Sequence, residues 1–205
     1  MKSRNNKLLI FTKSPILGEV KTRLQPEYSE EQSLVIHKKL MLKTLELTKS
    51  IDSVSSELCC APTRNTLFFL ECENNYPVIL SNQEGDNLGE RMAYSLSIAL
   101  QKHNKVVIIG TDCPEIDRSY IETAFDALNE FDAVIGPAFD GGYVLLGLKI
   151  FSPILFENID WGTDMVLAQT LEKLNVLEWS YHQLEMKNDI DRPEDVLKFN
   201  NFLNI

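Results

Sequence analysis

Residues 8–24 read Leu-Leu-Ile-Phe-Thr-Lys-Ser-Pro-Ile-Leu-Gly-Glu-Val-Lys-Thr-Arg-Leu. The apolar run at the start predicts a buried strand, and the loop that follows it carries Lys13, Lys21 and Arg23. In an open α/β sheet, ligands bind outside the carboxyl ends of the strands. Lys and Arg at such a place suit a phosphorylated ligand, Arg as a planar fork and Lys as a point charge. We therefore expect a phosphate-binding loop here, with a basic surface loop as the alternative.

The charge of this loop contrasts with that of the remaining chain. Residues 1–25 carry six Lys or Arg and one Glu, whereas the whole chain of 205 residues has a net charge of −10. Such an acidic chain is poorly suited to nonspecific nucleic-acid binding, which requires a basic surface. The loop has neither the glycines and lysine of a Walker A loop nor those of a dinucleotide fingerprint, although Gly18 can permit close backbone approach to a ligand.

Beyond the first strand, segments with strand and helix patterns alternate. The alternation predicts one α/β domain over residues 1–205, with a mostly parallel sheet and helices on both faces. Strands are expected at residues 7–12, 57–61, 77–81, 105–110, 133–136, 142–149 and 177–184. Helices are expected at residues 29–50, 88–102, 119–130, 163–174 and 193–202, and the apolar stretch 65–72 is ambiguous, with a short helix as one interpretation.

Composition narrows the class of protein. No stretch approaches the roughly 20 apolar residues that span a bilayer, and the apolar run after the basic N-terminus is too short for a signal peptide, so we expect a cytoplasmic protein. The four cysteines form no Cys-x-x-Cys pair, and adjacent Cys59 and Cys60 are expected to be reduced and structural. Three histidines are expected at the surface: His37, His103 and His182.

A second motif, Gly110-Thr111-Asp112-Cys113-Pro114, follows a strand rich in β-branched residues. This spacing places Asp112 at the carboxyl edge of the sheet, where a carboxylate can bind Mg²⁺ or Mn²⁺. The structural alternative is that Asp112 caps a following helical turn.

A third motif is Asp140-Gly141-Gly142-Tyr143, which precedes an alternating strand. Two glycines after an Asp are typical of a hairpin turn. They can also let the backbone approach a sugar or phosphate, with Asp140 binding hydroxyl groups or a metal. The two interpretations are compatible.

A fourth motif, Trp161-Gly162-Thr163-Asp164, precedes an expected helix. Thr163 and Asp164 would cap that helix, and Trp161 would either pack in the core or shape an acceptor pocket.

Near the C-terminus, Asp189 and Asp191 lie on one side of the chain if the segment is extended. They are candidate metal ligands, because two adjacent carboxylates repel each other unless a cation lies between them. A solvated acidic turn, with Asp191 capping the last helix, is the alternative. A weaker signal is Arg91, which can bind a phosphate or form a surface ion pair.

Together these motifs, in this order, resemble those of a bacterial glycosyltransferase-like family whose best-known branch is linked to arsenosugar biosynthesis. The matching motifs run from Phe11 to Asp195. The family belongs to the GT-A nucleotide-diphospho-sugar transferase superfamily, which includes guanylyltransferases. The resemblance implies a Rossmann-like three-layer α/β/α sandwich with a mostly parallel mixed sheet, and a nucleotide bound over the first loop with a divalent metal. Two departures are that Thr-Asp-Cys replaces the Asp-x-Asp of many glycosyltransferases, and that the first loop lacks the Gly-Gly of guanylyltransferases.

These considerations favour a metal-dependent glycosyltransferase-like enzyme that uses a nucleotide-sugar donor and a small-molecule acceptor. The expected nucleotide- and phosphate-binding residues are Lys13, Gly18, Lys21, Arg23 and Arg91. The expected ligands of Mg²⁺ or Mn²⁺ are Asp112, Asp189 and Asp191. Asp140 and Asp164 are the candidate catalytic residues, and the acceptor would contact Gly141, Gly142, Tyr143, Trp161 and Thr163. Two alternatives stay open: nucleotidyl transfer from a nucleoside triphosphate to a phosphorylated acceptor, and a non-catalytic nucleotide-binding protein. A homodimer is compatible with either.

Overall fold

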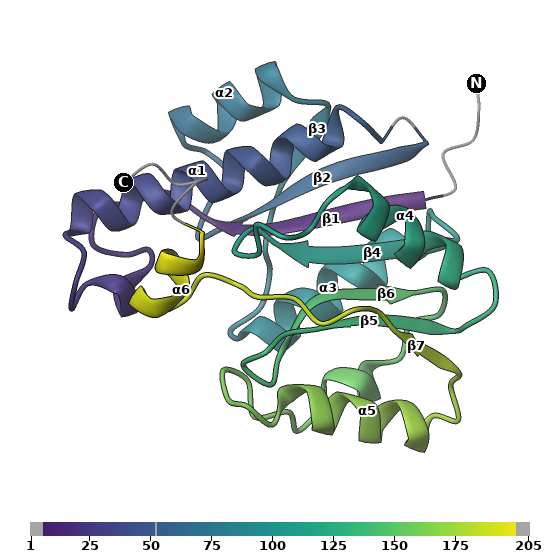
Figure 1. Cartoon of the computed structure of the whole chain (residues 1–205). Coiled ribbons are helices and arrows are strands. Elements are labelled where there is room, and N and C mark those ends of the chain that lie inside the picture. The colour runs from purple at the N-terminus through teal and green to yellow at the C-terminus, as the bar shows by residue number, and fades with distance from the viewer. Residues whose placement is uncertain (1–5, 52, 200–205) are drawn as a thin grey trace.

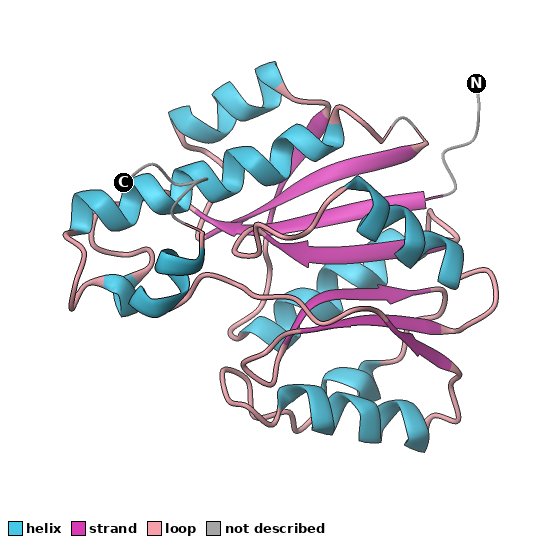
Figure 2. Cartoon of the chain, viewed as in Figure 1, coloured by secondary structure: helices cyan, strands magenta, loops and turns pink. Residues whose placement is uncertain are grey.

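A seven-stranded sheet between two layers of helices organises the computed structural model, which describes residues 6–51 and 53–199 (Figures 1 and 2). The strands are β1 (Asn6–Lys13), β2 (Val54–Ala61), β3 (Val78–Asn82), β4 (Lys105–Gly110), β5 (Ala133–Pro137), β6 (Tyr143–Leu148) and β7 (Tyr181–Gln183). The α-helices are α1 (Glu30–Thr48), α2 (Leu67–Asn75), α3 (Leu88–Leu100), α4 (Arg118–Ala127), α5 (Val166–Val176) and α6 (Pro193–Lys198). Two short 3₁₀ helices are η1 (Thr22–Leu24) and η2 (Pro153–Phe156).

The sheet is mixed and mostly parallel, as the sequence predicts. Its strand order is β3-β2-β1-β4-β6-β5-β7, and β1 pairs in parallel with both β2 and β4. Strand β6 is the exception, because it runs antiparallel to β4 and to β5. The carboxyl ends of β1 and β4 therefore lie side by side, and the turn between β5 and β6 lies at the same edge.

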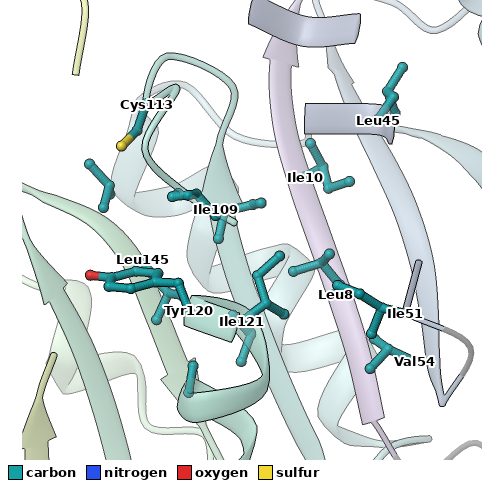
Figure 3. Packing of buried hydrophobic residues seen from close by; sticks show 14 of the residues in the cluster. Leu8, Ile10, Leu45, Ile51, Val54, Ile109, Cys113, Tyr120, Ile121 and Leu145 are labelled. Carbon is teal, nitrogen blue, oxygen red and sulfur yellow. The ribbon is translucent and has the colours of Figure 1, made fainter. Parts of the chain in front are cut away.

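Alternation along β1 builds the two halves of the core. Leu8 and Ile10 belong to the cluster that packs under α1, α2 and α4, and Leu9 and Phe11 belong to the cluster under α3, α5 and η2. Figure 3 shows part of the first cluster, with Leu8 and Ile10 beside residues of α1, α4 and neighbouring strands. The first strand is thus buried on both faces, as a central parallel strand should be.

Several expected element boundaries are wrong, among them the start of β2, the extent of β7 and the end of α6. Strand β2 begins at Val54 rather than Glu57, because the polar residues before Glu57 also pair with β1. The strand expected at residues 177–184 shrinks to Tyr181–Gln183, because Leu177 and Glu178 close the last turn of α5, with Glu178 at φ 55°. The last expected helix ends at Lys198, and residues 200–202 of that prediction lie outside the described residues.

Two expectations about helix starts and histidines also fail. Helix α5 begins at Val166 after Met165, which makes no side-chain cap bond, so Thr163 and Asp164 do not cap it. His37 is 4% exposed and lies on the buried face of α1. The four cysteines are free thiols in the core, as expected for Cys59 and Cys60. Within the described ranges, no helix has the length and apolar character needed to cross a membrane.

The central position of β1 gives a direct stability test. Ile10 is fully buried, so Ile10→Ala should lower the free energy of unfolding by about 2–5 kcal/mol through lost burial and a residual cavity. Ile79→Ala on the edge strand β3 is the matched control, because Ile79 is 57% exposed, and it should change stability by less than about 1 kcal/mol. Urea denaturation measures both, and equal losses would contradict the placement of β1 at the centre.

Candidate active site

A cleft with two joined compartments opens at the carboxyl edge of the sheet. One compartment, of about 690 Å³, is lined by Lys13, Lys21, Arg91 and Asp112 among others. The other, of about 770 Å³, is lined by Phe139, Asp140, Trp161, Thr163 and Asp164 among others. Arg23, Tyr143, Asp189 and Asp191 line both, so the two compartments meet there. The sequence-predicted residues thus gather at one edge of the sheet, except that neither Gly18 nor Gly141 lines a compartment.

Lys21 is the ion-pair partner of Asp112. The Lys21 side chain is 3% exposed, and its Nζ lies 2.8 Å from Asp112 Oδ1 while also donating to the carbonyl of Ile190. The backbone of Lys21 takes a left-handed conformation at φ 51°, which is uncommon outside Gly and Asn. This conformation turns the loop after β1 back toward the end of β4.

The carboxyl group of Asp112 is shared between Lys21 and the cleft. Its Oδ1 is buried at the ammonium, yet the side chain as a whole is 49% exposed. Burial alone would raise the pKa of Asp112, but Lys21 and His37 lower it below its ordinary value. Asp112 is therefore an ionised carboxylate with one oxygen available to a ligand. It does not cap a helix, because Asp117 caps α4.

A strap that runs from β7 to α6 brings the two C-terminal aspartates to the cleft. Within the strap, Ile190 is fully buried, and the side chains of Asp189 and Asp191 reach the cleft on either side of it in sequence. This is the predicted alternation. Asp191 Oδ2 accepts a hydrogen bond of 2.6 Å from Arg23, and the backbone N–H of Ile190 donates to the carbonyl of Asp112 at 2.9 Å. Helix α6 is capped through Asp195 rather than Asp191.

Asp189 is a carboxyl group of the cleft whose pKa is raised well above its ordinary value. Burial raises its pKa to about 6, and the negative charges of Asp140 and Asp112 add to the effect. Asp140 lies in the hairpin turn between β5 and β6, where its Oδ1 accepts from the N–H of Gly142 at 2.9 Å. The predicted hairpin is confirmed by the bond from the N–H of Ala138 to the carbonyl of Gly142.

Two cations of the first compartment keep their charge available. Within residues 6–51 and 53–199, neither Lys13 nor Arg91 forms an ion pair, although Arg91 Nε donates to the carbonyl of Gly85 at 2.9 Å. His37 Nε2 lies 2.9 Å from the carbonyl of Lys13 and holds the start of this loop. Sequence reasoning missed His37, although the spacing Ser33-His37-Leu40-Thr44 on one helical face could have indicated burial.

Close packing joins the two outer walls of the second compartment. A Cβ on Gly89 would lie 2.3 Å from the indole nitrogen of Trp161, so the indole rests directly on the first turn of α3. A Cβ on Gly141 would lie 2.2 Å from the carbonyl oxygen of Asp164, and the N–H of Leu167 donates to the carbonyl of Gly141 at 2.9 Å. Gly141 therefore supports the wall of the compartment.

The carboxylates of the cleft have the chemistry of a divalent-cation site without being gathered around one point. Oxygen ligands suit Mg²⁺ and Mn²⁺. Burial, together with the negative charges of Asp140 and Asp112, raises the pKa of Asp189, and a divalent cation would relieve the repulsion between these charges. Across the described part of the chain, however, no group of three His, Cys, Asp or Glu side chains is close enough to hold a metal. Binding would require Asp140 or Asp189 to move toward the free oxygen of Asp112.

Comparison with known proteins agrees with this fold. Residues 44–163 match the family described as "Uncharacterized protein conserved in bacteria (DUF2064)". The chain is 28% identical over 189 residues to the 2-phospho-L-lactate guanylyltransferase of Methanocaldococcus vulcanius, covering 92% of this chain and 82% of the relative. A solved structure from Desulfovibrio desulfuricans G20, described as a candidate nucleotide-diphospho-sugar transferase, is 30% identical with a TM-score of 0.85 and coverages of 96% and 87%.

More distant structures share the fold alone. A manganese complex of Rv0371c from Mycobacterium tuberculosis H37Rv has 13% identity and a TM-score of 0.56, with 98% of each chain covered. The nucleotide-diphospho-sugar transferase-like fold expected from the sequence is therefore confirmed. The named relatives found by sequence are guanylyltransferases, and this favours nucleotidyl transfer over sugar transfer among the expected activities.

The raised pKa of Asp189 predicts how stability changes with pH. The folded protein binds more protons than the unfolded chain between the ordinary Asp pKa near 4 and the value of about 6. Stability should therefore fall as pH rises through this window. Asp189→Asn should abolish that loss and raise the free energy of unfolding at pH 8 by about 1–3 kcal/mol.

Urea denaturation in EDTA at pH 4 and pH 8 measures this effect. The variant and the parent should differ much less at pH 4 than at pH 8. A difference independent of pH would show that the pKa of Asp189 is not raised in the folded protein.

The contact between Gly89 and Trp161 gives a second prediction. Gly89→Ala places a methyl group against the indole and should destabilise the fold by about 1–3 kcal/mol, despite the higher helix propensity of Ala. In a Trp161→Ala background the same change should become neutral or stabilising, which a double-mutant cycle of unfolding free energies measures. Additive effects would contradict the contact.

Proposed function

The chain belongs to the DUF2064 family, and we propose that it is a nucleotidyltransferase that joins a nucleoside triphosphate to a phosphorylated small molecule. The proposal rests on two adjoining compartments. One contains Lys13 and Arg91, which form no ion pair within the described residues, and the carboxylates Asp112, Asp140 and Asp189 lie between it and the other compartment or line that compartment. The guanylyltransferase relatives support this reaction class.

The first compartment would bind the triphosphate. Lys13 and Arg91 would neutralise phosphate oxygens, because no carboxylate of the described residues forms an ion pair with either of them. The charge of Lys21 and Arg23 suggests that they bind phosphate directly. They would instead have a positioning role, since both are paired with aspartates. They fix the positions of Asp112 and Asp191 at the junction, and Gly18 at φ 78° turns the loop that bears them.

A divalent ion would be held by the free oxygen of Asp112 together with Asp189 and Asp140 or Asp191. When bound, such an ion neutralises charge that develops on the phosphates. The manganese found in a protein of the same fold is consistent with this assignment.

In the proposed reaction, an oxygen of the acceptor phosphate attacks the α-phosphorus of the triphosphate. The bond from the α-phosphorus to the bridging oxygen of the β-phosphate breaks, and pyrophosphate leaves with the electron pair. A phosphate acceptor is already ionised, so no side chain has to remove its proton. Asp140 and Asp164 would then orient the acceptor, which would lie against Gly142, Tyr143 and Thr163 of the same wall.

Sugar transfer is the second candidate, favoured by the description of the 30% identical structure. It would use a hydroxyl acceptor, which requires a base, and Asp140 or Asp164 would supply it. Two parallel incubations in Mn²⁺ separate the activities: one with each nucleoside triphosphate and a mixture of phosphorylated acceptors, the other with nucleotide-sugars and a mixture of hydroxyl acceptors. Nucleotidyl transfer releases pyrophosphate, whereas sugar transfer releases a nucleoside diphosphate from a nucleotide-sugar.

Asp112→Asn tests the assignment of the junction. The variant should lose at least tenfold in affinity for nucleoside triphosphate in Mn²⁺ and much less in EDTA, because only the metal-assisted component depends on the carboxylate. Calorimetric titration measures both. Asp126→Asn, a change of an exposed aspartate on α4, is the control.

Asp112→Asn also leaves Lys21 without its partner, so its thermal unfolding is measured first. Asp140→Asn retains the Lys21–Asp112 pair and should show a weaker loss of the same kind. Unchanged metal dependence in both variants would sink the metal-site assignment.

A further inference from the structure

The second compartment is larger and more apolar than a small phosphorylated acid requires. Its volume of about 770 Å³ lies in the range of about 300–1,000 Å³ typical of sites for drug-sized ligands. The acceptor of the guanylyltransferase relatives, 2-phospho-L-lactate, has a three-carbon body. A molecule of that size would leave most of the walls of this compartment in water.

Two exposed apolar side chains line this compartment from different elements. Phe139, in the turn between β5 and β6, is 65% exposed, and Leu88, at the start of α3, is 48% exposed. Both would be stabilised by an apolar ligand, because exposed apolar surface in a cleft is removed from water on binding.

The same compartment holds Trp161 in a fixed position beside Leu88. The indole rests on Gly89, the residue after Leu88, and Met92 of the next turn also lines the compartment. An aromatic ring that is already immobilised loses little conformational entropy when a ligand packs on it. The wall is thus preorganised for an apolar body.

A free cation lies in the same compartment. Arg192, which follows Asp191 at the end of the strap, lines the compartment and has no ion pair within residues 6–51 and 53–199. The other cations of this compartment, Arg23 and Lys198, are paired with Asp191 and Asp195. Arg192 can therefore bind the anionic head of an acceptor in the second compartment, next to Asp191 of the junction.

We propose that the acceptor is a phosphate monoester of an apolar alcohol, with its alkyl or aryl body against Phe139, Leu88 and Trp161 and its phosphate near Arg192. This inference rests on the proposed function for the reaction, but binding alone can test it. In the transfer, an oxygen of the ester phosphate bonds to the α-phosphorus of the triphosphate to form the new P–O–P link, and pyrophosphate leaves.

The experiment compares three probes that differ in their apolar body: methyl phosphate, 2-phospho-L-lactate and benzyl phosphate. Calorimetric titration into the intact protein, with and without nucleoside triphosphate and Mn²⁺, should give at least tenfold tighter binding of benzyl phosphate than of the other two. Phe139→Ala should remove most of this advantage without changing triphosphate affinity. Arg192→Gln should weaken all three probes by a similar factor.

Ile79→Ala, a loss of similarly exposed apolar surface on β3, is the matched control and should change nothing. Equal affinity for the three probes, or an unchanged preference in Phe139→Ala, overturns the inference even if pyrophosphate release shows that the enzyme is a nucleotidyltransferase. Conversely, a benzyl phosphate preference that depends on Phe139, with no pyrophosphate formed from any triphosphate, supports the apolar site and refutes the proposed reaction.

Discussion

The ion pair between Lys21 and Asp112 is the interaction on which the geometry of the cleft depends. It joins the loop after β1 to the loop after β4, and the bond from Lys21 to the carbonyl of Ile190 adds the strap. Three segments far apart in the sequence are thereby fixed at one point. A buried ammonium group that loses its carboxylate is costly, typically about 3–5 kcal/mol, so this pair strongly disfavours alternative arrangements of the three segments. The left-handed backbone at Lys21 is the local strain that this arrangement requires.

The sequence predicts the fold well because its information is local. The apolar runs of β1 and β4 and the spacing of α1 and α3 correspond to elements that the structure contains. The side-by-side placement of Asp189 and Asp191 also follows from a local rule, the two-residue period of extended chain, with Ile190 buried between them. The errors lie where tertiary contacts decide the secondary structure. In β2, for example, the polar residues before Glu57 become strand only because β1 pairs with them.

The partners within the site could not be predicted in the same way. Lys21 and Arg23 have the composition of a phosphate clamp, yet each is paired with an aspartate that lies far along the chain. Likewise, Gly89 and Trp161 lie far apart in the sequence, and nothing near either residue shows that the absence of a side chain at Gly89 makes room for the indole. Residue type and position at a strand end identified the cleft, but the pairing of charges within it depends on how loops of different origin meet.

The pairing divides the cleft into regions of different charge. Lys21 and Arg23 compensate Asp112 and Asp191. Within residues 6–51 and 53–199, no ion pair engages Lys13 and Arg91 in the first compartment, Asp140 in the second or Asp189 at the junction. A polyphosphate would be attracted to Lys13 and Arg91 and repelled by Asp140 and Asp189. A divalent cation at the junction would reverse that repulsion, because it would be attracted to the carboxylates and to the phosphates alike. The two ligands should therefore bind cooperatively, and the crowding of Asp189 that opposes folding at neutral pH becomes the source of that cooperativity.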